Sequence, residues 1–324
     1  MTTSFRASSG GDGIIEVDGL IVAGSTFPAG KGTCYFVDAL NGSNTNSGTT
    51  WASPYLTMAK AFSVIESGDT IMFVGKIREQ LETPVQVFDV TIIGAGNRPR
   101  HADAAPAPVG GSSASTWTIP ASGATTAPLV KVLQQGWRLI NILFAGPTDH
   151  ACVNLYRDNG SGDDERDASH AEIINCRFAS GQDGILDTGG CYGVLLNGNT
   201  FNAMTGRAIK SASTVGAGHT NWQIIDNVIT GCANGIYLSA ITCKIKGNIF
   251  DDGGTPGTTN VLNTTGEAGG SGNNFIVGNY FQTTSANFNT PDIIGNATDV
   301  WNNINIDATF TSGGVSGLET GQPS

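Results

Sequence analysis

The segment Ile224-Ile225-Asp226-Asn227-Val228-Ile229 returns 21 residues later as Ile245-Lys246-Gly247-Asn248-Ile249-Phe250. Both segments place apolar residues before and after an Asn, a pattern that predicts two short strands joined at a corner. Related segments are Leu139-Ile140-Asn141-Ile142-Leu143-Phe144, Ile173-Ile174-Asn175-Cys176-Arg177-Phe178, Val194-Leu195-Leu196-Asn197-Gly198-Asn199-Thr200-Phe201, Phe275-Ile276-Val277-Gly278-Asn279-Tyr280-Phe281 and Val300-Trp301-Asn302-Asn303-Ile304-Asn305-Ile306. Such a repeat predicts a solenoid, in which each turn buries its apolar residues against its neighbours.

The spacing of the repeat favours a parallel β-helix. Alignment of Cys176, Asn199, Asn227, Asn248, Asn279 and Asn303 leaves intervals of 23, 28, 21, 31 and 24 residues. These intervals fit β-helix turns whose loops differ in length. Asn tolerates a left-handed backbone at a corner, and stacked Asn side chains can hydrogen-bond along a column. We therefore predict an all-β fold, a single-stranded right-handed parallel β-helix with an Asn ladder.

A further short strand is expected in each turn. It is led by Gly or another short residue, and the examples are Gly184-Ile185-Leu186, Arg207-Ala208-Ile209-Lys210, Gly235-Ile236-Tyr237-Leu238 and Asp292-Ile293-Ile294. The alternative fold is a β-sandwich, which would need frequent two-residue Asn-Gly or Asp-Gly hairpins. Such hairpins are scarce in the repeat region, so we favour the solenoid.

The first third of the chain has a different pattern. Cys34-Tyr35-Phe36-Val37-Asp38 predicts a strand, and Asn41-Gly42-Ser43 opens a loop. Residues 58–66 predict a short capping helix because their apolar residues share one face. Ser67-Gly68-Asp69 ends this helix, and Thr70-Ile71-Met72-Phe73-Val74 predicts the next strand.

This succession, with Trp51-Ala52-Ser53-Pro54 before the helix and Gly75-Lys76-Ile77-Arg78-Glu79 after the strand, resembles the N-terminal cap of the pectate-lyase-like β-helix superfamily. Ile77 stands where that opening has Tyr. The resemblance covers residues 33–80 closely and residues 85–306 only as a repeat. It implies the fold, while members of the superfamily include secreted polysaccharide lyases and hydrolases as well as phage tailspikes and other virion proteins.

Three regions are predicted. Residues 1–32 form an N-terminal arm, interpreted as an attachment segment; an unstructured terminus with one extra cap strand is an equal alternative. Residues 33–306 form the β-helix, with the cap at 33–80 and an inserted loop, rich in Ala, Pro, Ser and Gly, at 98–128. Residues 307–324 form a C-terminal tail.

Composition excludes several classes of partner. The net charge is −11 with only 16 Lys and Arg residues, whereas nucleic-acid binding needs a basic surface. The same deficit disfavours anionic membranes, and no run approaches the ~20 apolar residues of a membrane span. Nor does the linear sequence show a basic patch for an acidic polysaccharide. We therefore expect neither nucleic-acid binding nor membrane insertion.

The six cysteines show no metal-binding spacing. We predict free buried thiols, with disulfides as the alternative, and we expect no metal or cofactor. The first residues, Met1-Thr2-Thr3-Ser4-Phe5-Arg6, contain no apolar stretch of the signal-peptide kind. We therefore expect synthesis in a host cytoplasm without a signal peptide.

Candidate catalytic residues are few. Polysaccharide-cleaving enzymes need carboxylates that converge as acid and base, or a base with bound Ca²⁺. Weak candidates are Asp163 and Asp164, in an acidic loop more simply explained as solvated, and Asp183 and Asp187, which flank a predicted strand. Arg207, Lys210 and His219 are similar to polygalacturonase residues but occur in the wrong order, so we regard the match as coincidence. His101, His150 and His170 are isolated.

Three functions are compatible with these features. The leading hypothesis is a bacteriophage virion structural protein, a β-helical spike or a head-decoration or tail component, which is non-catalytic and able to bind host surface polysaccharide. The resemblance implies a homotrimer, with the N-terminal arm contacting other virion proteins. The alternative is a polysaccharide lyase or glycoside hydrolase. The third is a carbohydrate-binding module that uses exposed Trp side chains among Trp51, Trp117, Trp137, Trp222 and Trp301.

Overall fold

The computed structural model describes residues 32–96, 115–123, 125–158, 166–211, 219–238, 240–251 and 274–282, and outside these ranges only the backbone of short strands. Asp163, Asp164, His101 and the side chain of Trp301 lie outside the described residues, as does the predicted tail at 307–324.

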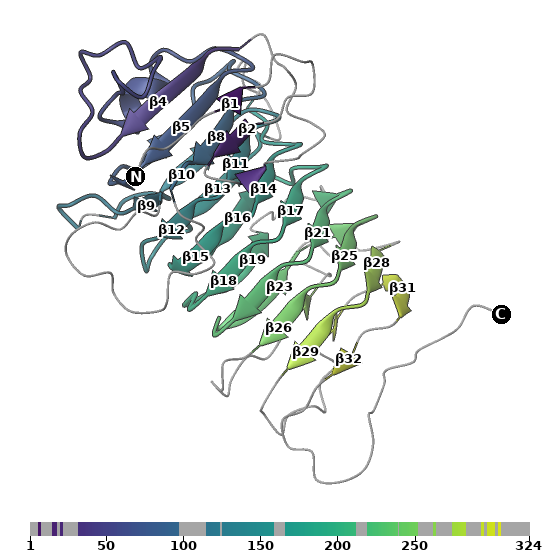
Figure 1. Cartoon of the computed structure of the whole chain (residues 1–324). Helices are drawn as coiled ribbons and strands as arrows, with labels where there is room; N and C mark the ends of the chain where they lie inside the picture. Colours follow the sequence, from purple (N-terminus) through teal and green to yellow (C-terminus); the bar gives the residue numbers. More distant parts are fainter. Residues whose placement is uncertain are drawn as a thin grey trace.

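Three long sheets, all parallel, contain most of the strands (Figure 1). The first sheet contains β4 (Cys34–Asp38), β5 (Thr70–Val74), β8 (Thr91–Gly94), β11 (Arg138–Ile140), β14 (Glu172–Ile174), β17 (Leu195–Asn197), β21 (Gln223–Ile225), β25 (Lys244–Lys246), β28 (Asn274–Val277) and β31 (Ala297–Trp301). The second contains β6 (Lys76–Ile77), β9 (Thr116–Thr118), β12 (Leu143–Ala145), β15 (Arg177–Ser180), β18 (Thr200–Asn202), β22 (Val228–Thr230), β26 (Ile249–Asp251), β29 (Tyr280–Gln282) and β32 (Ile304–Asn305). The third contains β7 (Leu81–Glu82), β10 (Val130–Val132), β13 (Val153–Tyr156), β16 (Ile185–Thr188), β19 (Arg207–Ser211), β23 (Asn234–Tyr237), β27 (Leu262–Asn263) and β30 (Ile293–Ile294).

The chain visits the three sheets in a fixed rotation. From β5 onward, each strand of the first sheet is followed by one of the second, one of the third, and then the next strand of the first. Each full rotation advances every sheet by one strand. A small parallel pair, β20 (His219–Thr220) and β24 (Ala240–Ile241), joins two neighbouring turns between the third and first sheets. These features confirm the predicted all-β parallel β-helix.

Inward side chains form apolar columns, one from each sheet. In the three-residue strands of the first and second sheets the middle residue is buried. The first sheet stacks Ile71, Ile92, Leu139, Ile173, Leu196, Ile224, Ile245 and Ile276. The second sheet stacks aromatic rings, with centroids 5.1 Å apart for Phe144 and Phe178 and 4.6 Å for Phe178 and Phe201. Because one turn cannot bury these residues alone, the stacking of turns supplies the core.

The corner between the first and second sheets contains the predicted Asn ladder. Asn199, Asn227, Asn248 and Asn279 are completely buried. The Oδ1 atom of each accepts a hydrogen bond from the backbone N–H of the aligned residue one turn earlier, at 2.9–3.0 Å and at the predicted intervals of 23, 28, 21 and 31 residues. Asn303 lies outside the described residues.

One detail of that prediction is wrong. The left-handed residue at this corner precedes the ladder Asn: examples are Gly198 (φ 66°), Asp226 (φ 55°) and Gly247 (φ 68°). The ladder residues themselves have no positive φ, because their side chains must turn inward. Gly, Asn and Asp tolerate the left-handed conformation best.

The single helix of the described residues, α1 (Met58–Phe62), lies within the predicted cap at residues 33–80. Its buried residues are Met58, Ala61 and Phe62. The predicted helix is longer, but Ser63 ends it, and Ile65 is buried in the turn that follows. With five residues, α1 is far shorter than a bilayer span, so the described part of the chain has no helix that could cross a membrane.

One predicted segment differs from the expectation. The loop prediction for 98–128 does not hold for β9, whose Trp117 is fully buried against Phe144 and Phe73. Pro, Ala and Ser on both sides conceal this strand in the sequence. In the predicted arm, β1 (Arg6–Ala7), β2 (Ile15–Val17) and β3 (Leu20–Ile21) form a separate antiparallel sheet.

Candidate functional site

The outer surface of the third sheet carries a row of polar and aromatic side chains. Strand register places Lys131, Asn154, Leu186, Lys210 and Tyr237 at equivalent positions on successive strands. Tyr156 and Thr188 form a second, shorter row beside them. All are partly exposed. We call this surface, with Arg207 beside it, the third-sheet face.

Two tyrosine rings on this face pair with cations. Lys131 Nζ lies 4.4 Å from the centre of the Tyr156 ring, and the Arg207 guanidinium carbon lies 4.4 Å from the centre of the Tyr237 ring. Such cation–π contacts fix the orientation of both partners. Tyr156 and Tyr237 belong to strands three positions apart, and with ~4.8 Å per strand they are separated by roughly 14 Å along the sheet.

Polar groups lie between the two rings. The Thr188 hydroxyl donates to Asn154 Oδ1 at 2.9 Å, and Lys210 Nζ lies 3.6 Å from Asp183 Oδ2. Lys131 Nζ also donates to Glu82 Oε1 at 3.0 Å. Flat rings, amide and hydroxyl groups, and cations are the groups that recognise sugar rings, hydroxyls and carboxylates respectively.

The linear sequence does not reveal this face. No basic patch is visible in it, because Lys131 is distant in sequence from Arg207 and Lys210. These cations meet only when the turns are stacked in register. An available signal was the alternation within each predicted third-sheet strand, which assigns one set of side chains to the outside.

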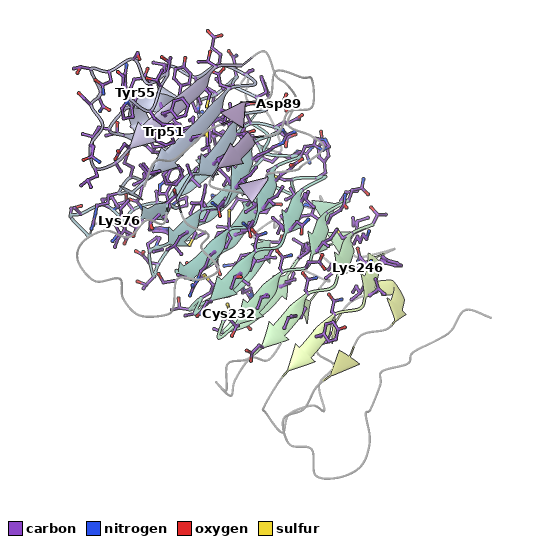
Figure 2. All side chains as sticks on the ribbon, viewed as in Figure 1. Trp51, Tyr55, Lys76, Asp89, Cys232 and Lys246 are labelled. Atoms are coloured by element: carbon purple, nitrogen blue, oxygen red, sulfur yellow. The ribbon has the colours of Figure 1, made fainter. Side chains whose placement is uncertain are left out.

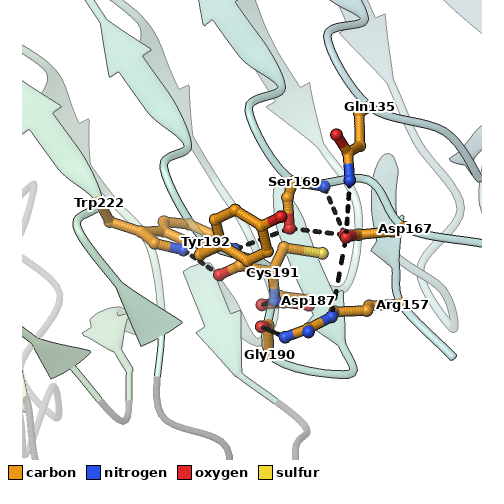
Figure 3. A network of polar contacts seen from close by, with 9 residues as sticks. All are labelled: Gln135, Arg157, Asp167, Ser169, Asp187, Gly190, Cys191, Tyr192 and Trp222. Carbon is orange, nitrogen blue, oxygen red and sulfur yellow. Dashed lines mark hydrogen bonds and ion pairs between the residues drawn. The ribbon is translucent and has the colours of Figure 1, made fainter. Parts of the chain in front are cut away.

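A polar network borders the third-sheet face where β13 ends (Figure 3). Arg157, directly after Tyr156, donates from Nη1 to the Gly190 carbonyl at 3.0 Å, and its Nε lies 3.8 Å from Asp167 Oδ2. Asp167 also accepts from Gln135 Nε2 at 3.0 Å and from the Ser169 hydroxyl at 2.5 Å. The network joins loops of successive turns, and it therefore holds this edge of the face in place.

The rest of the network is buried. Trp222 Nε1 donates to the Cys191 carbonyl at 2.6 Å, and the Cys191 N–H donates to Asp187 Oδ2 at 2.9 Å. Burial raises the pKa of the Cys191 thiol well above its ordinary value, and the charges of Asp187 and Asp167 raise it further. This thiol is therefore neutral at physiological pH and is unsuited to nucleophilic chemistry.

Asp183 and Asp187 are both predicted as weak catalytic candidates. Asp183 lies two residues before β16 and Asp187 lies within it, and both are almost fully buried. Asp183 Oδ1 accepts from the Arg207 N–H at 2.8 Å in the next turn, whereas Asp187 binds the Cys191 N–H in the turn after β16. Four residue steps separate them, roughly 13 Å along an extended strand. That separation exceeds the ~5–9.5 Å between paired carboxylates in most glycosidases.

Other chemistry-bearing residues are also engaged in structural contacts. Glu79 caps α1, Asp69 accepts from the N–H groups of Thr33 and Glu66, and Glu172 lies 3.3 Å from Arg138. Among the described residues, no group of three or more His, Cys, Asp and Glu side chains is arranged to hold a metal ion. All six cysteines are free and five are buried, as predicted.

Among the tryptophans whose side chains the structure describes, three are too deeply buried for the sugar stacking of the third hypothesis. Trp117, Trp137 and Trp222 are fully buried in the core. Trp51 lies in the cap with its ring centre 4.7 Å from that of Phe36 (Figure 2). On the described part of the third sheet, the partly exposed aromatic rings are those of Tyr156 and Tyr237.

Comparison with known proteins concerns the fold. No family model and no curated protein matches the sequence. A GH136 lacto-N-biosidase from Eubacterium ramulus superposes with a TM-score of 0.51 at 10% identity, over 78% of this chain and 52% of that one. XylC in complex with xylose superposes with a TM-score of 0.47 at 10% identity, over 85% of this chain and 68% of XylC. The Dettilon tailspike protein superposes with a TM-score of 0.35 at 12% identity, over 84% of this chain and 67% of the tailspike.

The fold is a parallel β-helix. The chain spans about half the length of the lacto-N-biosidase. At 10% identity the likeness extends to the β-helix alone, because this architecture supports many unrelated functions. Function must therefore be argued from the side chains of the third-sheet face.

Proposed function

We propose that this protein is a non-catalytic, glycan-binding β-helix of a bacteriophage virion, a spike or a head-decoration or tail component. The observation that carries the proposal is the third-sheet face, where two tyrosine–cation pairs flank Asn154, Thr188 and Lys210. A chain of sugars laid along the solenoid would contact both tyrosines at once. The cations suit a polysaccharide that carries carboxylates.

The body of the protein suits a rigid structural component. Each turn is bonded to its neighbours through three parallel sheets and the Asn ladder. Charged residues form 13% of the chain and Lys and Arg together number 16, so trypsin-like proteases have few sites. We further propose a homotrimer that contacts other virion proteins through residues 1–32.

Binding to purified host surface polysaccharides tests the function directly. We expect saturable binding by calorimetry, with the affinity reduced at least tenfold in the double variant Tyr156→Ala/Tyr237→Ala. The matched control is Tyr280→Ala, which removes an exposed tyrosine from the second sheet and should leave binding unchanged. An equal loss of affinity in the double variant and in Tyr280→Ala, or no binding by the native chain, would refute a glycan site on this face.

The same samples separate binding from catalysis. We expect no release of reducing ends or unsaturated sugars over prolonged incubation. Steady product release that persists after repurification would establish the lyase or hydrolase alternative instead. Mass spectrometry of purified particles tests the virion assignment, which requires the chain in a fixed copy number per particle; its absence from particles would exclude that assignment while leaving glycan binding intact.

A further inference from the structure

The small N-terminal sheet has two chemically different faces. Its register pairs Ala7 with Ile15, Arg6 with Glu16, Glu16 with Ile21 and Val17 with Leu20. Because successive residues of a strand alternate between faces, Ala7, Ile15, Val17 and Leu20 occupy positions on one face. The positions of the other face belong to Arg6, Glu16 and Ile21. One face is thus wholly apolar, whereas on the other face Arg6 is paired with Glu16.

Such a sheet requires a partner surface. Its strands contain two or three residues each, and isolated sheets of this size are marginally stable in water at best. An apolar face of this kind gains stability only when another apolar surface covers it.

The first sheet supplies a matching surface on its outer side. Ile93, Ile140 and Ile174 lie in register on β8, β11 and β14 and are partly exposed. We call them the isoleucine stripe. The neighbouring outward column carries Arg138 and Glu172, which form an ion pair. The stripe is thus an aliphatic column bordered by charge.

The connection between the two elements is long enough for them to meet. The chain joins the first sheet beside β4, where the Thr33 N–H donates to Asp69 Oδ1 at 2.6 Å. Strand β8 lies two positions from β4 and β14 lies four, or roughly 10 and 19 Å at ~4.8 Å per strand. The eleven residues from 22 to 32 can span up to ~36 Å.

We propose that the N-terminal sheet packs on the isoleucine stripe of the same chain, through the face that carries Ile15, Val17 and Leu20. The N-terminal segment is then a folded cover of the first sheet. This arrangement leaves the third-sheet face open, and it leaves β1 and β3 as the outer strands of the small sheet, available to pair with a strand of another protein. It does not depend on glycan binding.

Site-directed cross-linking tests the packing in the full chain. Val17→Cys is combined in turn with Ile93→Cys, Ile140→Cys and Ile174→Cys, in a Cys34→Ser background. The other native thiols are buried and have raised pKa values, so they react slowly. With a short bis-maleimide we expect most molecules of at least one pair to be linked within one chain.

The matched control is Glu16→Cys with the same three partners. Glu16 lies on the opposite face, so we expect less than a tenth of the linkage. Equal linkage from Glu16→Cys, linkage only between chains, or none would overturn the proposal. If the cysteine variants fold poorly, Val17→Lys replaces them: it should increase binding of a hydrophobic dye at least twofold, while Glu16→Lys should not, and equal dye binding by both contradicts the packing.

Discussion

At the scale of single residues, the side chain of Asn227 shows how the solenoid is held together. Its Oδ1 accepts from the backbone N–H and side-chain Nδ2 of Asn199, at 2.9 and 3.0 Å. Its Nδ2 donates to the Leu196 carbonyl and to Asn248 Oδ1, both at 3.0 Å. One buried amide therefore satisfies polar groups in both neighbouring turns, where water cannot reach them.

Asn227→Ala is expected to lower the free energy of unfolding by about 2–4 kcal/mol, because the Asn199 N–H and the Leu196 carbonyl, two backbone groups of the preceding turn, lose their partner. Urea denaturation followed by circular dichroism measures the change. Asn202→Ala is the matched control, since Asn202 is partly exposed on the second sheet, and it should change stability by less than about 0.5 kcal/mol. Equal effects of the two substitutions would contradict a structural role for the ladder.

Buried thiols make stability depend on alkaline pH. Burial raises the pKa of Cys176 to about 12 from an ordinary value of 9.0. Because the pKa is raised in the folded state, the contribution of the neutral thiol to the free energy of unfolding is complete below pH 9 and is lost as the pH rises toward 12. We expect the urea midpoint to fall between pH 9 and 11, and to fall less steeply in Cys176→Ala. Parallel curves for the two proteins would show that this thiol stays neutral in both states or ionises in both.

At the scale of elements, the cap depends on a carboxylate distant in sequence. Glu79, in the segment that resembles the superfamily cap, accepts from the Met58 and Ala59 N–H groups, both at 2.9 Å. These are the first amides of α1, which no helical carbonyl can satisfy. The side chain therefore ties the helix to the turn after β6.

Glu79→Ala should destabilise the protein by about 1–2 kcal/mol and speed hydrogen exchange at the Met58 and Ala59 amides. Glu82→Ala removes a side chain that is 57% exposed and pairs with Lys131 at the surface, so it should have little effect on either measurement. Unchanged exchange in Glu79→Ala would mean that Thr57, which accepts from Lys60 N, caps the helix by itself.

Elements also show what the sequence could predict. The strands around Asn227 and Asn248 were identifiable because apolar residues recur at the interval of one turn, and the ladder intervals were correct. Strand β9 was not identifiable, since a single Trp between threonines has no period. The third-sheet face was identifiable only in part: alternation within its strands assigns the outward side chains, but loops of unequal length hide the register that brings them together. Asp183 and Asp187 were predicted because they flank one predicted strand, and this closeness in sequence does not show whether their side chains are buried.

At the scale of the whole molecule, the solenoid should tolerate the loss of a complete turn. Deletion of residues 199–226 joins Gly198 to Asn227 and preserves the corner, the ladder and the order of the sheets. We expect the shortened protein to unfold in one cooperative transition and to keep the circular dichroism spectrum of a β protein. Deletion of residues 199–211 removes only the second-sheet and third-sheet strands of that turn, and should prevent folding. If the complete-turn deletion unfolds as well, the turns are not interchangeable units.

The most direct measurement is a crystal structure of the protein with a bound oligosaccharide from the polysaccharide that it binds best. We predict sugar rings along the third-sheet face, in contact with Tyr156 and Tyr237 and with carboxylates or hydroxyls near Lys131, Arg207 and Lys210. An oligosaccharide bound to the first or second sheet, with the third-sheet face empty, would contradict this account.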